Sequence, residues 1–209
     1  MGHPVPSTAG PARRMKALAA AAELAMAVPM ILGRGAVARA ILAEARLTAD
    51  DRAADIGCGP GTAARIAAAR GVAVTGVDPS PIALGLARAL SRRADARRIT
   101  WAQGSAERLP LHAGAITVAW SISSVHHWAD QAASCAEIYR VLAPGGRVVL
   151  AERLIRPGAT GLAAHGSTRE QAEELCRTLS AAGFVAVTSQ TMVTGRRTRI
   201  VVRGERQAA

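Results

Sequence analysis

Aromatic residues and lysine are scarce in this chain of 209 residues, which has one lysine and five aromatic side chains. So few rings leave little surface on which nucleic-acid bases can stack. The formal net charge of +11 comes from arginines scattered over most segments, without a basic stripe. We therefore do not expect a nucleic acid as the partner. Half of the residues are hydrophobic, which predicts a core of Ala, Val, Leu and Ile.

Cysteines and long apolar runs are also few. Cys58, Cys135 and Cys176 are odd in number and lack the spacing of a metal site, which favours reduced thiols in a cytoplasmic protein without a metal.

Residues 13–32 superficially resemble a secretory signal, because basic residues precede an Ala-rich run. Glu23 interrupts that run, so an amphipathic surface helix is the preferred interpretation. No other apolar run approaches the length that crosses a membrane.

The chain divides into a tail, a helical extension and one larger domain. Residues 1–10 have the Pro, Ser and Gly content of a flexible tail. Residues 11–46 show two helical patterns, which Gly33 and Gly35 separate. Residues 47–205 form the main domain, in which strand and helix patterns alternate. Its predicted strands are 52–56, 72–77, 99–102, 116–121 and 147–151, and its helices are 61–69, 81–94 and 130–142.

The last part of the domain departs from this alternation. We expect a helix from Ser167 or Thr168 to about Ala182, with Ser167 as the candidate cap and Glu170 completing a capping box. Two strands, 184–190 and 196–203, follow with a short turn between them and predict an antiparallel hairpin. The fold class is therefore α/β: a Rossmann-like, doubly wound and mainly parallel sheet of seven strands, with a C-terminal antiparallel hairpin and an N-terminal helical extension.

A strand, a glycine-rich turn and a helix follow one another around Gly57. Gly57, Gly59 and Gly61 let backbone N–H groups approach a polar ligand at the start of a helix. Thr62 stands where a nicotinamide-binding fingerprint requires a further glycine, which disfavours a hydride-transfer cofactor. Asp78 ends the next strand, where a carboxylate can accept hydrogen bonds from both hydroxyls of a ribose. The pattern indicates a nucleoside-bearing ligand.

Five segments in order resemble the motifs of class I S-adenosylmethionine-dependent methyltransferases. The likeness is greatest to the small-molecule subgroup that includes the ubiquinone and menaquinone type, also called methyltransferase type 11. The matching segments are residues 55–61, 76–80, 104–110, 125–128 and 137–147. Five ordered matches are far more specific than one glycine motif. The resemblance implies S-adenosylmethionine as the cofactor and methyl transfer as the activity.

The resemblance also implies which residues contact the methyl donor. Gly57, Gly59 and Gly61 would close on the methionine part of the donor, and Asp55 would lie near its ammonium group. Asp78 would hold the ribose. The adenine would be bordered by Ser105 and Ala106, and the methionine part would also pass beside Ser121 and Ile122. The family usually has Asp at the position of Ser105, and a neutral hydroxyl would accept a hydrogen bond from the adenine more weakly.

Two histidines are candidates for a base. Methyl transfer from a sulfonium needs alignment and a dry site, and a base helps when the acceptor is a hydroxyl or an activated carbon. His126 and His127 come just after the fourth strand, at the sheet edge where ligands bind. The alternative for either residue is a loop histidine bonded to backbone. His165, after the fifth strand, is a further candidate to line the acceptor pocket.

A small-molecule acceptor, methylated on oxygen or carbon, is the preferred interpretation. Methylation of RNA or protein is an alternative that the basic charge alone supports. Against it, the fourth strand ends in Ser-Ile-Ser-Ser. The resemblance implies that an enzyme methylating the amino groups of nucleobases would have Asn-Pro-Pro or Asp-Pro-Pro at this point. A protein that binds S-adenosylmethionine without catalysis is the third interpretation.

Overall fold

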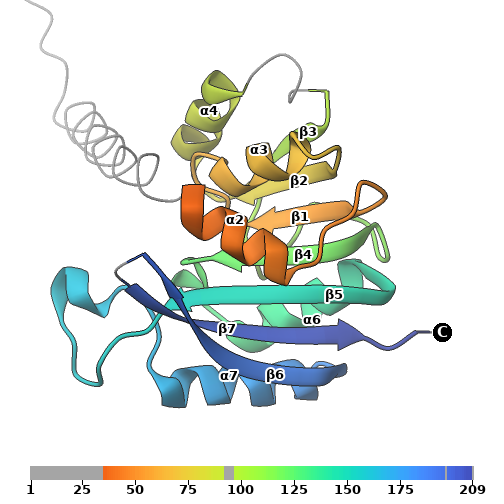
Figure 1. Ribbon diagram of the computed structural model, residues 1–209. Helices are drawn as coiled ribbons and strands as arrows, with labels where there is room; N and C mark the ends of the chain where they lie inside the picture. Colours follow the sequence, from red (N-terminus) through yellow and green to blue (C-terminus); the bar gives the residue numbers. More distant parts are fainter. Residues whose placement is uncertain (1–34, 92–96, 196, 209) are drawn as a thin grey trace, which may run out of the picture.

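The computed structural model describes residues 35–91, 97–195 and 197–208, and these residues form one seven-stranded sheet with helices on both faces (Figure 1). The strands are β1 (Arg52–Ile56), β2 (Ala73–Asp78), β3 (Ile99–Gln103), β4 (Ile116–Ile122), β5 (Leu142–Arg153), β6 (Phe184–Thr194) and β7 (Arg197–Arg206). The helices are α2 (Gly35–Glu44), α3 (Thr62–Ala68), α4 (Pro81–Leu90), α6 (Gln131–Val141) and α7 (Arg169–Ala181), with 3-10 helices η1 (Val125–His127) and η2 (Gly161–Ala164).

The strand order is β3-β2-β1-β4-β5-β7-β6. The first five strands in this order pair in parallel, and β7 pairs antiparallel with both β5 and β6. The predicted fold class is confirmed, including the C-terminal hairpin. Because the strand order reverses between β1 and β4, the carboxyl ends of these two strands open a crevice, which is where open α/β sheets bind ligands.

Two apolar clusters cover the two faces of the sheet. One joins α6 and α7 to the sheet, and the other joins α2 and α3 to it. The central strand β4 belongs to both, because Ala119 packs in the first cluster while Val118 and Trp120 pack in the second. Burial on both faces explains why β4 reads as an almost continuous apolar run.

The second predicted helix of the N-terminal extension is present as α2. The predicted tail and the first helix of the extension lie outside the described residues, as does the run at 13–32. Within the three described ranges, no helix is both long and apolar enough to cross a membrane.

The start of α7 differs from the prediction by one residue. Thr168 is the N-cap: its hydroxyl accepts from the Gln171 amide at 3.2 Å, and the Gln171 side chain accepts from the Thr168 amide at 2.8 Å. Ser167 instead pairs with the end of β5, where its amide donates to the Arg153 carbonyl at 2.9 Å. That pairing holds Ser167 extended, so the predicted capping box of Ser167 and Glu170 is wrong.

Arg147 fastens the end of α2 to the sheet. Its guanidinium donates to the carbonyls of Ala45 and Arg46 at 2.5 and 3.0 Å, and to the Asp51 carboxylate at 2.7 and 3.1 Å. The Thr117 hydroxyl donates to Asp51 at 2.7 Å. Burial acts to raise the pKa of Asp51, but the hydrogen bonds from Arg147 and Thr117 outweigh it and lower the pKa to about 2.

Replacing Asp51 with asparagine is expected to lower the free energy of unfolding at pH 7 by about 2 kcal/mol, because folding favours the carboxylate. The contribution is complete above the ordinary pKa of 3.8 and is lost as the pH falls through about 2. Urea unfolding at pH 7 and at about pH 2.5 checks this, with the exposed Asp50→Asn as the control. An Asp51→Asn effect of equal size at both pH values contradicts the prediction.

Candidate active site

The glycine turn joins the end of β1 to the start of α3 at the carboxyl edge of the sheet. Gly57, Gly59 and Gly61 have φ angles of 67°, 53° and 73°, in the left-handed region that favours glycine. The Gly57 amide donates to the Val77 carbonyl at 2.8 Å, which ties the turn to β2. A Cβ atom on Gly57 would collide with the side chain of Ser124. The turn is therefore fixed by its neighbours before any ligand binds.

Trp101, on β3, packs against the same turn. A Cβ atom on Gly61 or on Gly76 would collide with its ring. These two glycines are thus needed to accommodate a tryptophan, a role that was not predicted from the sequence. The only sequence signal was the scarcity of aromatic residues, which makes each one a candidate anchor.

Two carboxylates flank the turn. Asp78 accepts from the amides of Gly59 and Ser80 at 2.8 and 2.9 Å, one on each oxygen. Asp55 accepts from the Ala64 amide in the first turn of α3 at 3.1 Å. Both acids are buried, with exposed fractions of 8% for Asp78 and 3% for Asp55. Because each carboxylate oxygen has two lone pairs, Asp78 retains the capacity to accept from two ribose hydroxyls.

Two buried hydroxyl groups near the carboxyl edge of the sheet lack a hydrogen-bond partner among the residues that the structure describes. They are Thr62 Oγ1, at the start of α3, and Ser121 Oγ, near the end of β4. Leaving such a group unsatisfied costs about 1–3 kcal/mol. A polar ligand bound in the turn would supply a partner for the Thr62 hydroxyl at the N-terminus of α3, so the residues present fit S-adenosylmethionine. Thr62 was not among the predicted donor contacts.

The predicted adenine contacts follow β3. Ala106 is buried and Ser105 is half-buried. Burial acts to raise the pKa of Glu107. Its hydrogen bonds, of which the one with the Ser105 side chain has the largest effect, outweigh burial and lower the pKa. The Ser105 hydroxyl therefore faces Glu107, and its lone pairs can still accept from an adenine amino group. Ile122, the last residue of β4, is buried at the carboxyl edge.

The chain between β4 and η1 is held in an unusual conformation. Ser123 has a φ of 56°, which non-glycine residues rarely adopt. Its amide donates to the Ala151 carbonyl at 2.7 Å, and its hydroxyl accepts from the buried Arg199 at 3.0 Å. These bonds turn the chain so that η1 lies beside the end of β5.

His126, in η1, is oriented by Glu152 near the end of β5. His126 Nδ1 lies 2.9 Å from Glu152 Oε2, and Glu152 Oε1 accepts from the Val125 amide at 2.7 Å. Because a carboxylate only accepts, this contact places a proton on Nδ1 and, in the neutral ring, the lone pair on Nε2. Nε2 is buried and has no partner in the described part of the chain. Glu152 was not predicted as a site residue. The only signal for it in the sequence is a charged residue at the end of an apolar strand.

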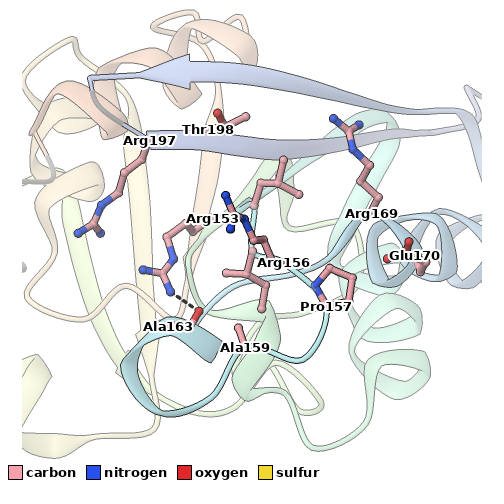
Figure 2. A pocket seen from close by; sticks show the side chains of 11 residues that line it. Arg153, Arg156, Pro157, Ala159, Ala163, Arg169, Glu170, Arg197 and Thr198 are labelled. Carbon is pink, nitrogen blue, oxygen red and sulfur yellow. Dashed lines mark hydrogen bonds between the residues drawn. The ribbon is translucent and has the colours of Figure 1, made fainter.

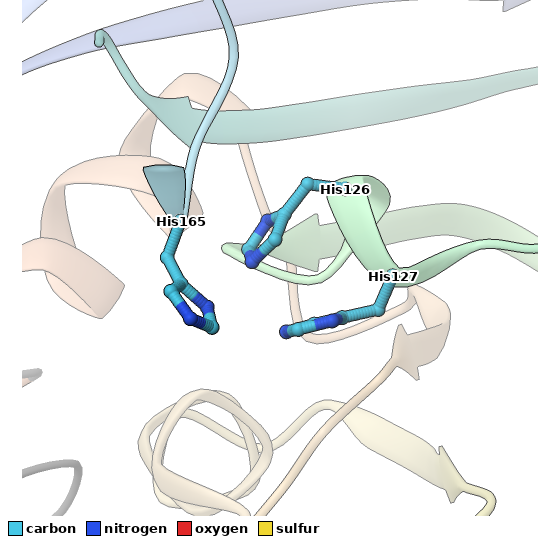
Figure 3. Close-up of side chains that lie close together, drawn as sticks. All are labelled: His126, His127 and His165. Atoms are coloured by element: carbon cyan, nitrogen blue, oxygen red, sulfur yellow. The ribbon is translucent and has the colours of Figure 1, made fainter. Parts of the chain in front are cut away.

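The structure brings the two candidate bases together with His165, which follows η2. The ring centroids of His126 and His127 are 4.0 Å apart, and that of His165 lies 5.4 and 5.6 Å from them (Figure 3). His127 and His165 are exposed. No metal was predicted from the sequence, yet the ligand nitrogens of these three residues lie within 4.8 Å of one another.

A cavity of about 630 Å³ lies beyond the end of β5, at the sheet edge that also carries the glycine turn. Arg153, Arg156, Arg169 and Arg197 line it, with Glu170 as its acid (Figure 2). Arg153 donates to two carbonyls of η2 at 2.9 and 2.6 Å, which holds the loop that carries His165. The cavity therefore has an excess of positive charge.

The cysteines do not add a nucleophile to the site. Cys58, Cys135 and Cys176 are free thiols. Burial, reinforced by the charges of Asp55 and Asp78, raises the pKa of Cys58 far above its ordinary range. Because the thiolate is the reactive form, Cys58 is inert and serves to fill the turn.

The fold and the site define a class of protein: a Rossmann-like sheet with a glycine turn and two buried acids at its carboxyl edge, where such sheets bind ligands. Residues 54–150 match the family described as "Methyltransferase domain". The predicted family, class I S-adenosylmethionine-dependent methyltransferases, is confirmed for this segment, and S-adenosylmethionine is the cofactor of that family.

Two relatives illustrate the sequence similarity. The 27-O-demethylrifamycin SV methyltransferase of Amycolatopsis mediterranei is 38% identical over 120 residues, which are 56% of this chain and 44% of the relative. The ubiquinone biosynthesis O-methyltransferase of Aromatoleum aromaticum is 36% identical over 101 residues, or 48% of this chain and 43% of the relative. The matches thus span less than half the length of these two relatives.

Solved structures share the fold at low sequence identity. The cyclase SpnF has a TM-score of 0.72 and 18% identity, with 84% of this chain and 82% of that chain covered. Phosphoethanolamine N-methyltransferase 2 of Haemonchus contortus, solved with S-adenosyl-L-methionine, has a TM-score of 0.67 and 20% identity, with 81% and 52% covered. These similarities concern the fold alone.

Proposed function

We propose that this protein transfers a methyl group from S-adenosylmethionine to a hydroxyl group of a small molecule. The observation that carries the proposal is the pair of Glu152 and His126 at the carboxyl edge of the sheet. The pair offers a buried imidazole lone pair at Nε2, and a base of this kind suits an acceptor that must lose a proton. The names of the two relatives above, both oxygen methyltransferases, support the same acceptor chemistry.

The residues of the site divide the work between binding and proton transfer. The glycine turn, Asp55 and Asp78 bind and orient the donor. When bound, S-adenosylmethionine supplies an electrophilic methyl group and a neutral thioether leaving group. His126 Nε2 takes the proton that the acceptor hydroxyl must lose when it is methylated. The Glu152 carboxylate stabilises the imidazolium that results.

Transfer of an isotope-labelled methyl group tests the proposal. The purified protein is incubated with labelled S-adenosylmethionine and, separately, with catechol, 3,4-dihydroxybenzoate, an aromatic amine and total RNA. Label recovered in a methyl ether supports the proposal. Label on RNA or nitrogen contradicts it, and donor binding without transfer to any acceptor supports a non-catalytic protein.

The arginine-lined cavity is the proposed binding site for an anionic group of the acceptor. Replacing the exposed Arg156 with glutamate is expected to raise the KM for an anionic acceptor about 10-fold, because a favourable charge interaction becomes repulsive, with little change in kcat. Steady-state kinetics with 3,4-dihydroxybenzoate and with catechol check this. Arg70→Glu, an exposed charge reversal outside the cavity, is the control. An equal effect on both acceptors contradicts the prediction.

A further inference from the structure

Three of the five histidines of the chain meet at one point beside the proposed active site. His126 and His127 come from η1, and His165 comes from the loop that follows η2. Their rings surround a common space (Figure 3), and their ligand nitrogens lie within 4.8 Å of one another. We propose that His126, His127 and His165 form a binding site for one divalent transition-metal ion such as Zn²⁺.

The spacing of the rings is close to that of a zinc site. With Zn–N distances of about 2.1 Å and tetrahedral angles, imidazole centroids lie about 5 Å apart. The separations from His165, 5.4 and 5.6 Å, approach this value. The 4.0 Å between His126 and His127 is shorter than this value. Three histidines leave a fourth position for water or an acceptor oxygen.

Glu152 gives His126 the second contact that metal-binding histidines usually have. A ligating imidazole commonly donates its other N–H to a carboxylate, which fixes the ring and raises its basicity. His126 Nδ1 has this contact with Glu152 at 2.9 Å, while the buried Nε2 has no partner in the described ranges. Imidazole nitrogens favour Zn²⁺, Cu²⁺ or Ni²⁺ over Mg²⁺ or Ca²⁺.

A metal ion and the proposed base use the same lone pair. An ion bound to His126 Nε2 blocks proton transfer to that atom, so we expect the metal-bound protein to be inactive in the proposed reaction. Binding of the ion itself does not depend on the proposed function, because neither the donor nor the acceptor takes part in it. The two proposals can therefore fail separately.

Cobalt titration of the 209-residue chain tests the site. Co²⁺ is added to chelator-treated protein carrying His3→Asn, so that the N-terminal histidine contributes nothing, and the visible d–d absorption of tetrahedral Co²⁺ is recorded. We expect one ion per chain and displacement of Co²⁺ by Zn²⁺. His165→Asn is expected to weaken binding at least 10-fold, and Glu152→Gln about 10-fold.

The exposed His112→Asn is the matched control and should bind as the parent does. Far-UV circular dichroism of each variant shows that the fold is retained. The proposal is overturned if the parent gives no tetrahedral Co²⁺ spectrum, or if His165→Asn gives the same spectrum and affinity as the parent.

Discussion

Replacing His126 with asparagine is expected to lower kcat about 100-fold or more in chelator-treated protein, while the dissociation constant of S-adenosylhomocysteine stays within about 2-fold. The reason is that Nε2 is the proposed proton acceptor, whereas the donor is bound by the glycine turn and Asp78. Methyl-transfer kinetics and calorimetric titration separate the two effects. If the variant keeps the wild-type kcat, His126 is not the base.

Glu152→Gln provides a sharper version of this experiment. Glutamine keeps an acceptor for the Val125 amide, which now donates to the carboxylate at 2.7 Å, but it has no charge to stabilise the imidazolium. Its N–H₂ group also favours the tautomer with the proton on Nε2. A fall in kcat without a change in donor affinity is expected. His112→Asn, outside the site, should leave both unchanged.

Asp78→Ala is expected to weaken the binding of S-adenosylhomocysteine by about 100- to 1,000-fold. The variant loses two hydrogen bonds from ribose hydroxyls to a buried carboxylate, each contributing about 1.5–2 kcal/mol. It also frees the Gly59 and Ser80 amides that the carboxylate now holds. Isothermal titration calorimetry measures the loss.

Two matched variants complete this prediction. Asp78→Asn retains one carbonyl acceptor of similar size and should lose less affinity than the alanine variant. Asp50→Ala, at an exposed position, should bind as the parent does. Equal affinity in Asp78→Ala and the parent would show that this acid does not hold the ribose.

The β1–turn–α3 unit was predictable from the sequence because its signals are local. The bounds predicted for β1 agree with those observed, and the glycine turn follows where the strand passes into the helix. Neighbouring residues also misled the prediction. Ser167 and Thr168 are both good caps, and only the pairing of Ser167 with β5 decides between them.

Contacts that join distant segments were less predictable. Glu152 meets His126 only because β4 and β5 are neighbours in the sheet. Trp101 meets Gly61 and Gly76 through the packing of β3 against the turn. His165 reaches η1 through the path of an irregular loop, which periodicity does not describe.

The family match ends within β5. The match ends at residue 150, whereas Glu152, His165 and the arginine-lined cavity all come after it. A chimaera joined within β5 would keep the glycine turn and replace His165 and the arginine-lined cavity. If these later residues select the acceptor, as we propose, the acceptor preference of the chimaera will follow the relative that supplies them.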